Sequence, residues 1–364
     1  MNRPSKTRDE IRQRLAEGGR GLVMLDIRDD VDFLAQTPTH GDPRAWVDAC
    51  HAVGTDAVIL IGEADYLPAD HPWGRKRRTR RDGEKTIVDI TQPTPLGPLH
   101  GQEVTTPGQK PARTKMFMES PPDYDAFIAL MAAWRDSRRE ITANLARVRR
   151  TIGPDGVLAV FIAQPMEMYY FILQYDMVMH YLDWPETYGR AMVEVEETAH
   201  CVIDCADDAG ADMIMFGGAG TEIFNPEMIE RHIIDPSRRY VEHCRRRDLF
   251  SLMHCCGRTQ ILLDKGWFES LRPTIFESFT ESPLGDIASP TTAVKQLPAD
   301  IFFKGGLSLD LLHRGSPRDV EQAVRRAYAE FGDHRFILAG TCAILTGTPK
   351  ENLLAATRTA MEYQ

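Results

Sequence analysis

Short apolar runs recur along the chain, and each is followed by an amphipathic stretch. Within the runs most positions are apolar, without strict alternation of polar and apolar residues, which is typical of strands that are covered on both faces. The amphipathic stretches between them are typical of helices. The eight predicted strands are residues 21–27, 56–61, 157–163, 211–216, 249–255, 274–279, 301–305 and 335–340.

Several of the predicted helices carry clear boundary signals. Residues 121–148 form one long charged stretch, and residues 185–209 end before Gly210, a plausible helix stop. A capping residue followed by proline at the first helical position is a common helix start. This pattern occurs at Asn225-Pro226, Ser316-Pro317 and Thr348-Pro349. Glu351, three residues after Thr348, has the spacing of a capping box.

Eight strands that alternate with helices predict a (β/α)₈ TIM barrel, with a doubly wound parallel sheet as the alternative. We expect a single domain over residues 1–364. Residues 67–117 break the pattern, because they contain a basic run and a cluster of proline and glycine. We interpret this segment as an excursion after the second strand, an insertion or a lid, in which residues 86–90 have the character of a hairpin strand.

The composition narrows the class of protein. The chain has 364 residues, 43% of them hydrophobic, and a net charge of −10, which argues against broad nucleic-acid binding. No apolar run reaches the length of a membrane span, and the first residues lack a signal peptide. Seven cysteines without a disulfide-like spacing favour the cytoplasm. The basic run Arg75–Arg81 is a solvated loop or a contact for an acidic protein or anionic substrate.

The strongest chemical signal lies at the end of two predicted strands. His254 and Cys256 are two residues apart, so they project to the same face of a strand. Cys342 follows another strand, and the carboxyl ends of barrel strands gather at one rim. One imidazole and two thiolates are a ligand set for catalytic Zn²⁺, with a fourth position open. The alternative is a hydrogen-bonded core histidine beside ordinary buried cysteines.

At these residues the sequence resembles the uroporphyrinogen decarboxylase superfamily, and within it the zinc-dependent methyltransferases that act with corrinoid proteins. The shared patterns are Gly210-Ala211-Asp212, Phe224-Asn225-Pro226-Glu227, Met253–Gly257, Lys304–Ser308 with Leu312 and Gly315–Pro317, and Thr348-Pro349 with Glu351–Leu353. A weaker match includes Thr94–Gly97. The resemblance implies a TIM barrel with the site at its mouth, and a zinc ion on His254, Cys256 and Cys342. The arginine-rich N-terminal motif of the decarboxylases is not recognisable.

Further candidates follow other predicted strands. Glu222 is a base, a fourth zinc ligand or a helix-capping carboxylate, and Glu277 faces the barrel mouth or pairs with a buried cation. Glycines at 217–220 suggest close approach of the backbone to a ligand. We therefore expect catalytic roles for Glu222 and Glu277 and substrate contacts for Gln164, Glu167, Tyr169 and Gly218.

These observations and the resemblance together predict a zinc-dependent methyltransferase that moves a methyl group from a corrinoid to a thiol. The expected cofactor is Zn²⁺, and the expected partners are a corrinoid (cobalamin) protein, a small-molecule thiol and, for assembly, a second copy of the chain. We expect no nucleic-acid or membrane partner. The alternatives are a metal-free decarboxylase acting on a carboxylate, methyl transfer to tetrahydrofolate, and a non-catalytic protein that binds corrinoid or zinc.

Overall fold

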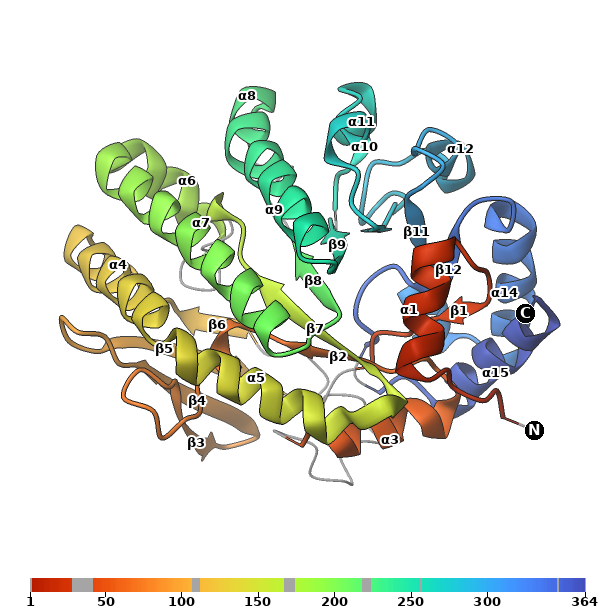
Figure 1. The fold of residues 1–364 in the computed structure, drawn as a ribbon, viewed down its shortest axis with the longest axis horizontal. Coiled ribbons are helices and arrows are strands. Elements are labelled where there is room, and N and C mark those ends of the chain that lie inside the picture. The colour runs from red at the N-terminus through yellow and green to blue at the C-terminus, as the bar shows by residue number, and fades with distance from the viewer. Residues whose placement is uncertain are drawn as a thin grey trace.

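Eight parallel strands form one curled sheet at the centre of the molecule (Figure 1). The computed structural model describes residues 2–27, 42–106, 112–166, 174–217, 224–255, 257–345 and 347–363. The strands are β1 (Leu22–Val23), β2 (Val58–Ile61), β7 (Val157–Ile162), β8 (Met213–Phe216), β9 (Phe250–His254), β10 (Ile275–Glu277), β11 (Phe302–Leu307) and β12 (Phe336–Gly340). Their order is β1-β12-β11-β10-β9-β8-β7-β2, which confirms all eight predicted strands and the barrel architecture.

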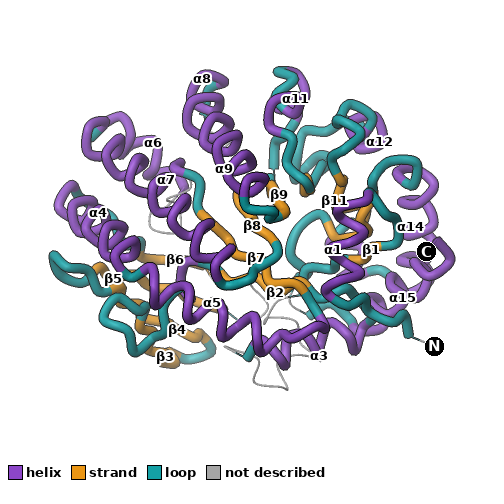
Figure 2. The backbone as a smooth tube through the Cα atoms, in the orientation of Figure 1, coloured by secondary structure: helices purple, strands orange, loops and turns teal. Residues whose placement is uncertain are grey.

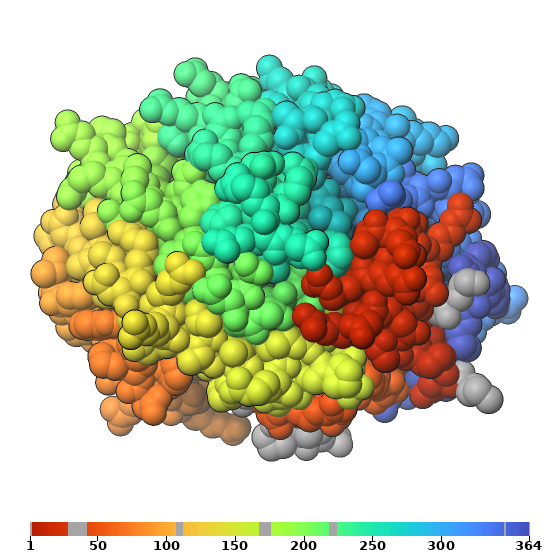
Figure 3. All heavy atoms as spheres, in the orientation of Figure 1, coloured from red at the N-terminus to blue at the C-terminus, as the bar shows by residue number. Residues whose placement is uncertain are grey.

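Alternate residues of each strand divide between two apolar cores. In β7, Val157, Ala159 and Phe161 pack in an inner cluster with the equivalent residues of the other strands, whereas Leu158 and Val160 face the surrounding helices. Helix α1 (Arg8–Glu17) adds Ile11 and Leu15 to the inner cluster and thereby covers the amino end of the barrel. Figure 3 shows this red N-terminal segment lying against the yellow and green segments on that face.

A buried ion pair lies where the first and second strands of the barrel begin. Arg3 donates to both carboxylate oxygens of Asp56, and neither side chain has any exposed surface. The same carboxylate accepts a hydrogen bond from the backbone N–H of Val23, and the N–H of Asp56 donates to the carbonyl of Val23. Since β1 and β2 are the two ends of the strand order, these bonds close the barrel at its amino end.

Asp212, the last residue of the Gly210-Ala211-Asp212 pattern, has a structural role. Its carboxylate is fully buried and contacts three arginines, Arg8 and Arg12 from α1 and Arg149. It also accepts from the backbone N–H of Leu158. The residue precedes β8, at the amino end of the barrel, where side chains serve stability while the catalytic groups of TIM barrels lie at the opposite end.

The helices surround the sheet (Figure 2). They are α3 (Pro43–Val53), α4 (Pro121–Asp136), α5 (Arg138–Ile152), α6 (Gln174–Asp183), α7 (Pro185–Asp208), α8 (Pro226–Ile229), α9 (Asp235–Arg246), α10 (Gln260–Asp264), α11 (Phe268–Leu271), α12 (Pro290–Val294), α13 (Leu309–Arg314), α14 (Pro317–Phe331) and α15 (Lys350–Ala360). A π-helical turn, η4 (Glu230–Ile234), joins α8 to α9. No described helix is both long enough and apolar enough to cross a membrane.

Most helix boundaries agree with the sequence, with two corrections. Asn225 caps α8, and Ser316 with Asp319 forms a capping box on α14, as the start signals predict. The single helix predicted over residues 121–148 is wrong, because the chain breaks at Ser137 into α4 and α5. The capping box at Thr348 is also wrong, since α15 begins one residue later, at Lys350, and Pro349 occupies the cap position.

The excursion after β2 is a small antiparallel sheet. Its strands, in spatial order, are β3 (Lys76–Asp82), β4 (Lys85–Gln92), β5 (Leu99–Thr105) and β6 (Ala112–Lys115). The hairpin strand predicted at 86–90 lies within β4. Most of the basic run lies in β3, an edge strand whose residues are all exposed, while Arg75 just before it is buried. The role of this segment as a lid stays a prediction.

Candidate functional site

Two of the three predicted zinc ligands lie side by side. His254 is the last residue of β9, and Cys342 follows the end of β12 by two residues. Their Nε2 and Sγ atoms are 3.9 Å apart, although 88 positions separate the residues in the sequence. Both residues lie at the carboxyl end of the barrel, where TIM-barrel enzymes carry their active sites. The third predicted ligand, Cys256, lies outside the described residues.

Backbone hydrogen bonds from three neighbouring elements hold the segment around Cys342. The hydroxyl of Ser278, just after β10, donates to the carbonyl of Thr341 at 2.6 Å. The N–H of Thr341 donates to the carbonyl of Leu307, at the end of β11. The N–H of Ile344 donates to the carbonyl of Asp26, beyond β1. The thiol is therefore positioned by rigid parts of the barrel.

A buried carboxylate faces the other nitrogen of His254. Glu277 is 1% exposed, and its Oε2 atom lies 3.7 Å from His254 Nδ1 and 2.8 Å from Lys304 Nζ. Burial by itself would raise the pKa of Glu277, but the ammonium of Lys304 and the contact with His254 outweigh it and hold the pKa well below its usual range. Glu277 is therefore ionised at neutral pH. The sequence left two interpretations of Glu277, a position facing the barrel mouth or a pair with a buried cation. In the structure it pairs with the buried cation Lys304 beside the mouth.

The thiol of Cys342 is also perturbed. Burial would raise its pKa, but the neighbouring imidazole of His254 more than compensates and lowers the pKa below the ordinary value of a cysteine. A lowered pKa favours the thiolate, the form in which cysteine binds metals and attacks electrophiles.

Gly217 brings the end of β8 against the backbone of His254. Its φ of +97° lies in the left-handed region, and a Cβ atom there would be 2.2 Å from the carbonyl oxygen of His254. The sequence suggests that the glycines at 217–220 approach a ligand. For Gly217 the close neighbour is instead the protein's own strand β9.

We expect Gly217→Ala to destabilise the fold by about 1–3 kcal/mol or more, since the methyl group adds a clash to backbone strain. Gly62→Ala is the matched control, because nothing lies within 4 Å of the added Cβ at that strand end. Urea unfolding of both variants measures the difference. Equal midpoints for the two variants would contradict the tight contact.

The remaining predicted residues divide into two groups. Gln164, which follows β7, is 1% exposed and its amide nitrogen donates to Ser237 and to the carbonyl of Ile233. Its role in substrate binding stays a prediction. Glu167, Tyr169, Gly218 and Glu222 lie outside the described residues, as does Cys256. Within the described ranges, no group of three or more His, Cys, Asp or Glu side chains is arranged to hold a metal ion.

Sequence reasoning missed two charged residues. Lys304 sits in the middle of the apolar strand β11 and is 5% exposed. A lone charge in a buried run is the signal that could have identified it. Glu63 follows β2 and is 8% exposed, but it faces the space between the barrel and helices α4 and α7. Its sequence context gives no such signal, because it stands in a polar segment after the strand.

Burial raises the pKa of Glu63 to about 7, against the opposing effect of Arg75 and Arg113 and with a small contribution from Asp65 in the same direction as burial. The folded state therefore binds this proton more tightly than the unfolded chain. Below pH 4.5 Glu63 is protonated in both the folded and the unfolded state, so its raised pKa does not lower the stability of the fold. The free energy of unfolding falls as the pH rises from 4.5 to about 7, because the folded state then has to bury an ionised carboxylate. The total decrease is up to about 3 kcal/mol and is complete above pH 7.

We therefore expect Glu63→Gln to gain stability relative to the natural chain as the pH rises from 5 to 8. Urea unfolding at several pH values measures this difference, and the comparison cancels the titration of all other groups. A stability difference that does not change over this pH range would show that Glu63 has an ordinary pKa.

Comparisons with known proteins agree with this architecture. The sequence profile of the family described as uroporphyrinogen decarboxylase (URO-D) matches residues 97–363. A methyltransferase from Methanosarcina mazei superposes with a TM-score of 0.65 at 13% identity, over 97% of this chain and 98% of that one. A B12-independent methionine synthase from Shewanella sp. W3-18-1 gives 0.48 at 12% identity, over 100% and 98%.

The search of curated proteins gives no match. The solved structures are too distant in sequence to establish more than the fold, but the family profile spans well over half of the chain, including His254, Glu277, Lys304 and Cys342. The eight-stranded barrel agrees with this match, and the profile itself shows that this chain belongs to the uroporphyrinogen decarboxylase family.

Proposed function

We propose that this protein is a zinc-dependent methyltransferase that transfers a methyl group from the cobalt of a corrinoid to a thiol. The observation that carries the proposal is the meeting of His254 and Cys342 at the mouth of the barrel, with Glu277 and Lys304 behind the histidine. The similarity in fold to a methyltransferase supports the same reaction class.

The two side chains fit a zinc ion. Tetrahedral zinc binds sulfur at about 2.3 Å and imidazole nitrogen at about 2.0–2.1 Å, which puts two such ligand atoms roughly 3.5 Å apart. The observed separation of Sγ and Nε2 is 3.9 Å, close to that value. His254, Cys342 and, by the sequence pattern, Cys256 would hold the ion. When bound, zinc holds a thiol as its thiolate at neutral pH.

The residues around His254 would then have distinct roles. The carboxylate of Glu277 keeps the proton of His254 on Nδ1 and leaves Nε2 as the ligand atom, because a donor faces an anion better than a lone pair does. Lys304 balances the charge of Glu277 in a buried position where an unpaired carboxylate would be costly. Methyl transfer of this kind is an in-line displacement, so positioning of donor and acceptor by the barrel would contribute strongly to its rate.

The test is a metal analysis of the purified protein combined with a methyl-transfer assay. We expect about one zinc per chain and loss of the methyl group of methylcobalamin when a thiol is added. Several small thiols are to be compared, since the acceptor is expected to be a small molecule and the natural corrinoid to reside on a partner protein. Active protein without zinc, or demethylation without any thiol, would contradict the proposal.

We expect Lys304→Met to weaken zinc binding by about 10–100-fold, the usual effect of disturbing a residue behind a metal ligand. Without the ammonium, the pKa of Glu277 rises and the carboxylate orients His254 less well. Competition with a chelator measures the affinity, and Lys295→Met, at an exposed site, is the control. Unchanged zinc affinity in Lys304→Met would mean that the pair has no part in the site.

The second candidate is decarboxylation of a carboxylate substrate without metal, the reaction after which the family is described. A carboxylate needs a free cation at the site. Among the residues that the structure describes, Lys304 contacts this cluster, and it is already paired with Glu277 at 2.8 Å. This pairing favours methyl transfer over decarboxylation, and an active metal-free protein would reverse the preference.

A further inference from the structure

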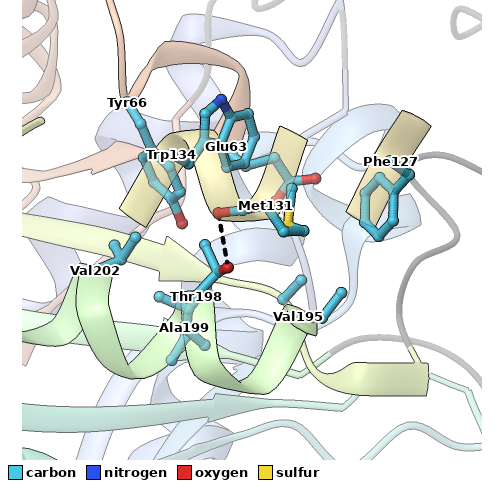
Figure 4. A pocket seen from close by; sticks show the side chains of 11 residues that line it. Glu63, Tyr66, Phe127, Met131, Trp134, Val195, Thr198, Ala199 and Val202 are labelled. Carbon is cyan, nitrogen blue, oxygen red and sulfur yellow. Dashed lines mark hydrogen bonds between the residues drawn. The ribbon is translucent and has the colours of Figure 1, made fainter. Parts of the chain in front are cut away.

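A pocket lies outside the barrel, between the ends of β2 and β7 and the helices α4 and α7. Figure 4 shows Tyr66 and Trp134 on one side, Phe127 on the other, and four side chains of α7 below them. Apart from Glu63 and Thr198, its lining is apolar or aromatic. The lining residues are Glu63, Tyr66, Phe127, Met131, Trp134, Ile162, Ala163, Val195, Thr198, Ala199 and Val202.

Glu63 supplies the one charge in this lining. The residue is more than nine-tenths buried, and both of its carboxylate oxygens are without a hydrogen-bond partner among the described residues. The two hydroxyl groups nearby are engaged elsewhere: that of Thr198 donates to the carbonyl of Met131, and that of Tyr66 to the carbonyl of Phe161. Arg75 and Arg113 act on this carboxylate electrostatically, but neither donates a hydrogen bond to it. Since buried polar groups in native proteins are almost always hydrogen-bonded, the carboxylate has the capacity to bind a hydrogen-bond donor.

The lining restricts the chemistry of that partner. A hard metal ion needs six or more oxygen ligands, and one carboxylate in an apolar pocket does not provide them. A cation with an apolar part fits better, because its charged end pairs with Glu63 while its carbon atoms contact the rings and aliphatic side chains. The rings of Tyr66, Phe127 and Trp134 line the pocket, and aromatic linings attract organic ammonium ions through cation–π contacts.

The free space limits the size of the ligand. The cavity volume is about 30 Å³. One water requires about 10–15 Å³ on this scale, so the pocket holds roughly two or three small groups. Methylammonium and ethylammonium have two and three non-hydrogen atoms. Tetramethylammonium, with five, is too large.

We propose that this pocket is a binding site for a short primary alkylammonium ion, held by the carboxylate of Glu63 and the surrounding aromatic rings. The site is separate from the cluster around His254, so the proposal stands or falls independently of zinc and of methyl transfer. A bound ion would link the end of β2 to α4 and α7.

The test is titration of the protein with methylammonium chloride. Binding is measured by calorimetry and by the shift of the thermal unfolding midpoint. Potassium chloride at equal ionic strength is the reference. We expect saturable binding with one site per chain. Glu63→Gln keeps the size and polarity of the side chain and removes its charge, so affinity should fall at least tenfold, in keeping with the loss of a charged hydrogen bond. Glu84→Gln, in an exposed turn, should bind like the natural chain.

Three results would overturn the proposal. The first is the absence of saturable binding by the natural chain in the millimolar range. The second is equal affinity of the natural chain and Glu63→Gln, which would place any binding elsewhere. The third is binding of tetramethylammonium as tight as that of methylammonium, since the pocket is too small for it. The first result would leave Glu63 as a buried carboxylic acid, protonated or bonded to water.

Discussion

Replacing His254 with alanine is expected to reduce methyl transfer from methylcobalamin to a thiol at least about a thousandfold. The substitution removes the imidazole that faces Cys342 at 3.9 Å, and the zinc that the proposal assigns to this cluster loses one of three protein ligands. Metal activation is worth several kcal/mol of barrier, and each 1.36 kcal/mol is about a factor of ten in rate. The zinc content of the purified variant should fall together with its activity.

Cys342→Ser should have the same effect, because a hydroxyl is a far poorer zinc ligand than a thiolate. His100→Ala and Cys201→Ser are matched controls, one at an exposed histidine and the other at a half-buried cysteine on α7. Both should retain zinc and activity. A His254→Ala protein that still demethylates methylcobalamin at the natural rate would remove the basis of the proposed mechanism.

The second large effect concerns stability. Asp56→Asn is expected to lower the free energy of unfolding by about 3–5 kcal/mol, because it leaves the guanidinium of Arg3 buried without its counter-charge. The carboxylate also anchors the N–H of Val23, so the seam between β1 and β2 weakens at the same time. Urea unfolding, followed by circular dichroism, measures the change.

The control is an ion pair of similar length on the surface. Arg325 and Glu362 lie 2.9 Å apart and are about half exposed, so Glu362→Gln should lower the stability far less than Asp56→Asn. If Asp56→Asn and Glu362→Gln have equal effects, the buried pair does not hold the barrel closed.

The barrel was predictable because its strands are covered on both faces. A run such as Val157–Ile162 is apolar at every position and therefore stands out from the amphipathic helices around it. The four-stranded sheet was not predictable in the same way. In β3 every residue is exposed and most are basic, so no periodic pattern marks it as a strand.

The helix break at Ser137 was hidden for a different reason. Neither glycine nor proline marks the position, and the helical pattern continues on both sides of it. The serine hydroxyl bonds back to the carbonyl of Ala133, a local contact that competes with the regular helix. Such competition depends on the packing of α4 and α5 against the barrel, which a single sequence does not reveal.

At the site, position along the strands was enough to place His254 near Cys342, because both follow strands whose carboxyl ends share one rim. Predicting Lys304 as the partner of Glu277 would have required the register of the sheet. Glu277 pairs with His254 across β9 and β10, and Lys304 reaches it from the next strand, β11. Strand order and register are long-range properties, so the contact between Lys304 and Glu277 could be recognised only in the structure.

The most direct test of the central proposal is X-ray absorption spectroscopy at the zinc edge of the purified protein. With His254, Cys256 and Cys342 as ligands, the spectrum should fit two sulfur atoms at about 2.3 Å and nitrogen or oxygen atoms at about 2.0–2.1 Å. Addition of the thiol acceptor should raise the sulfur count to three. A protein that contains no zinc, or a zinc ion surrounded only by nitrogen and oxygen, would contradict the account.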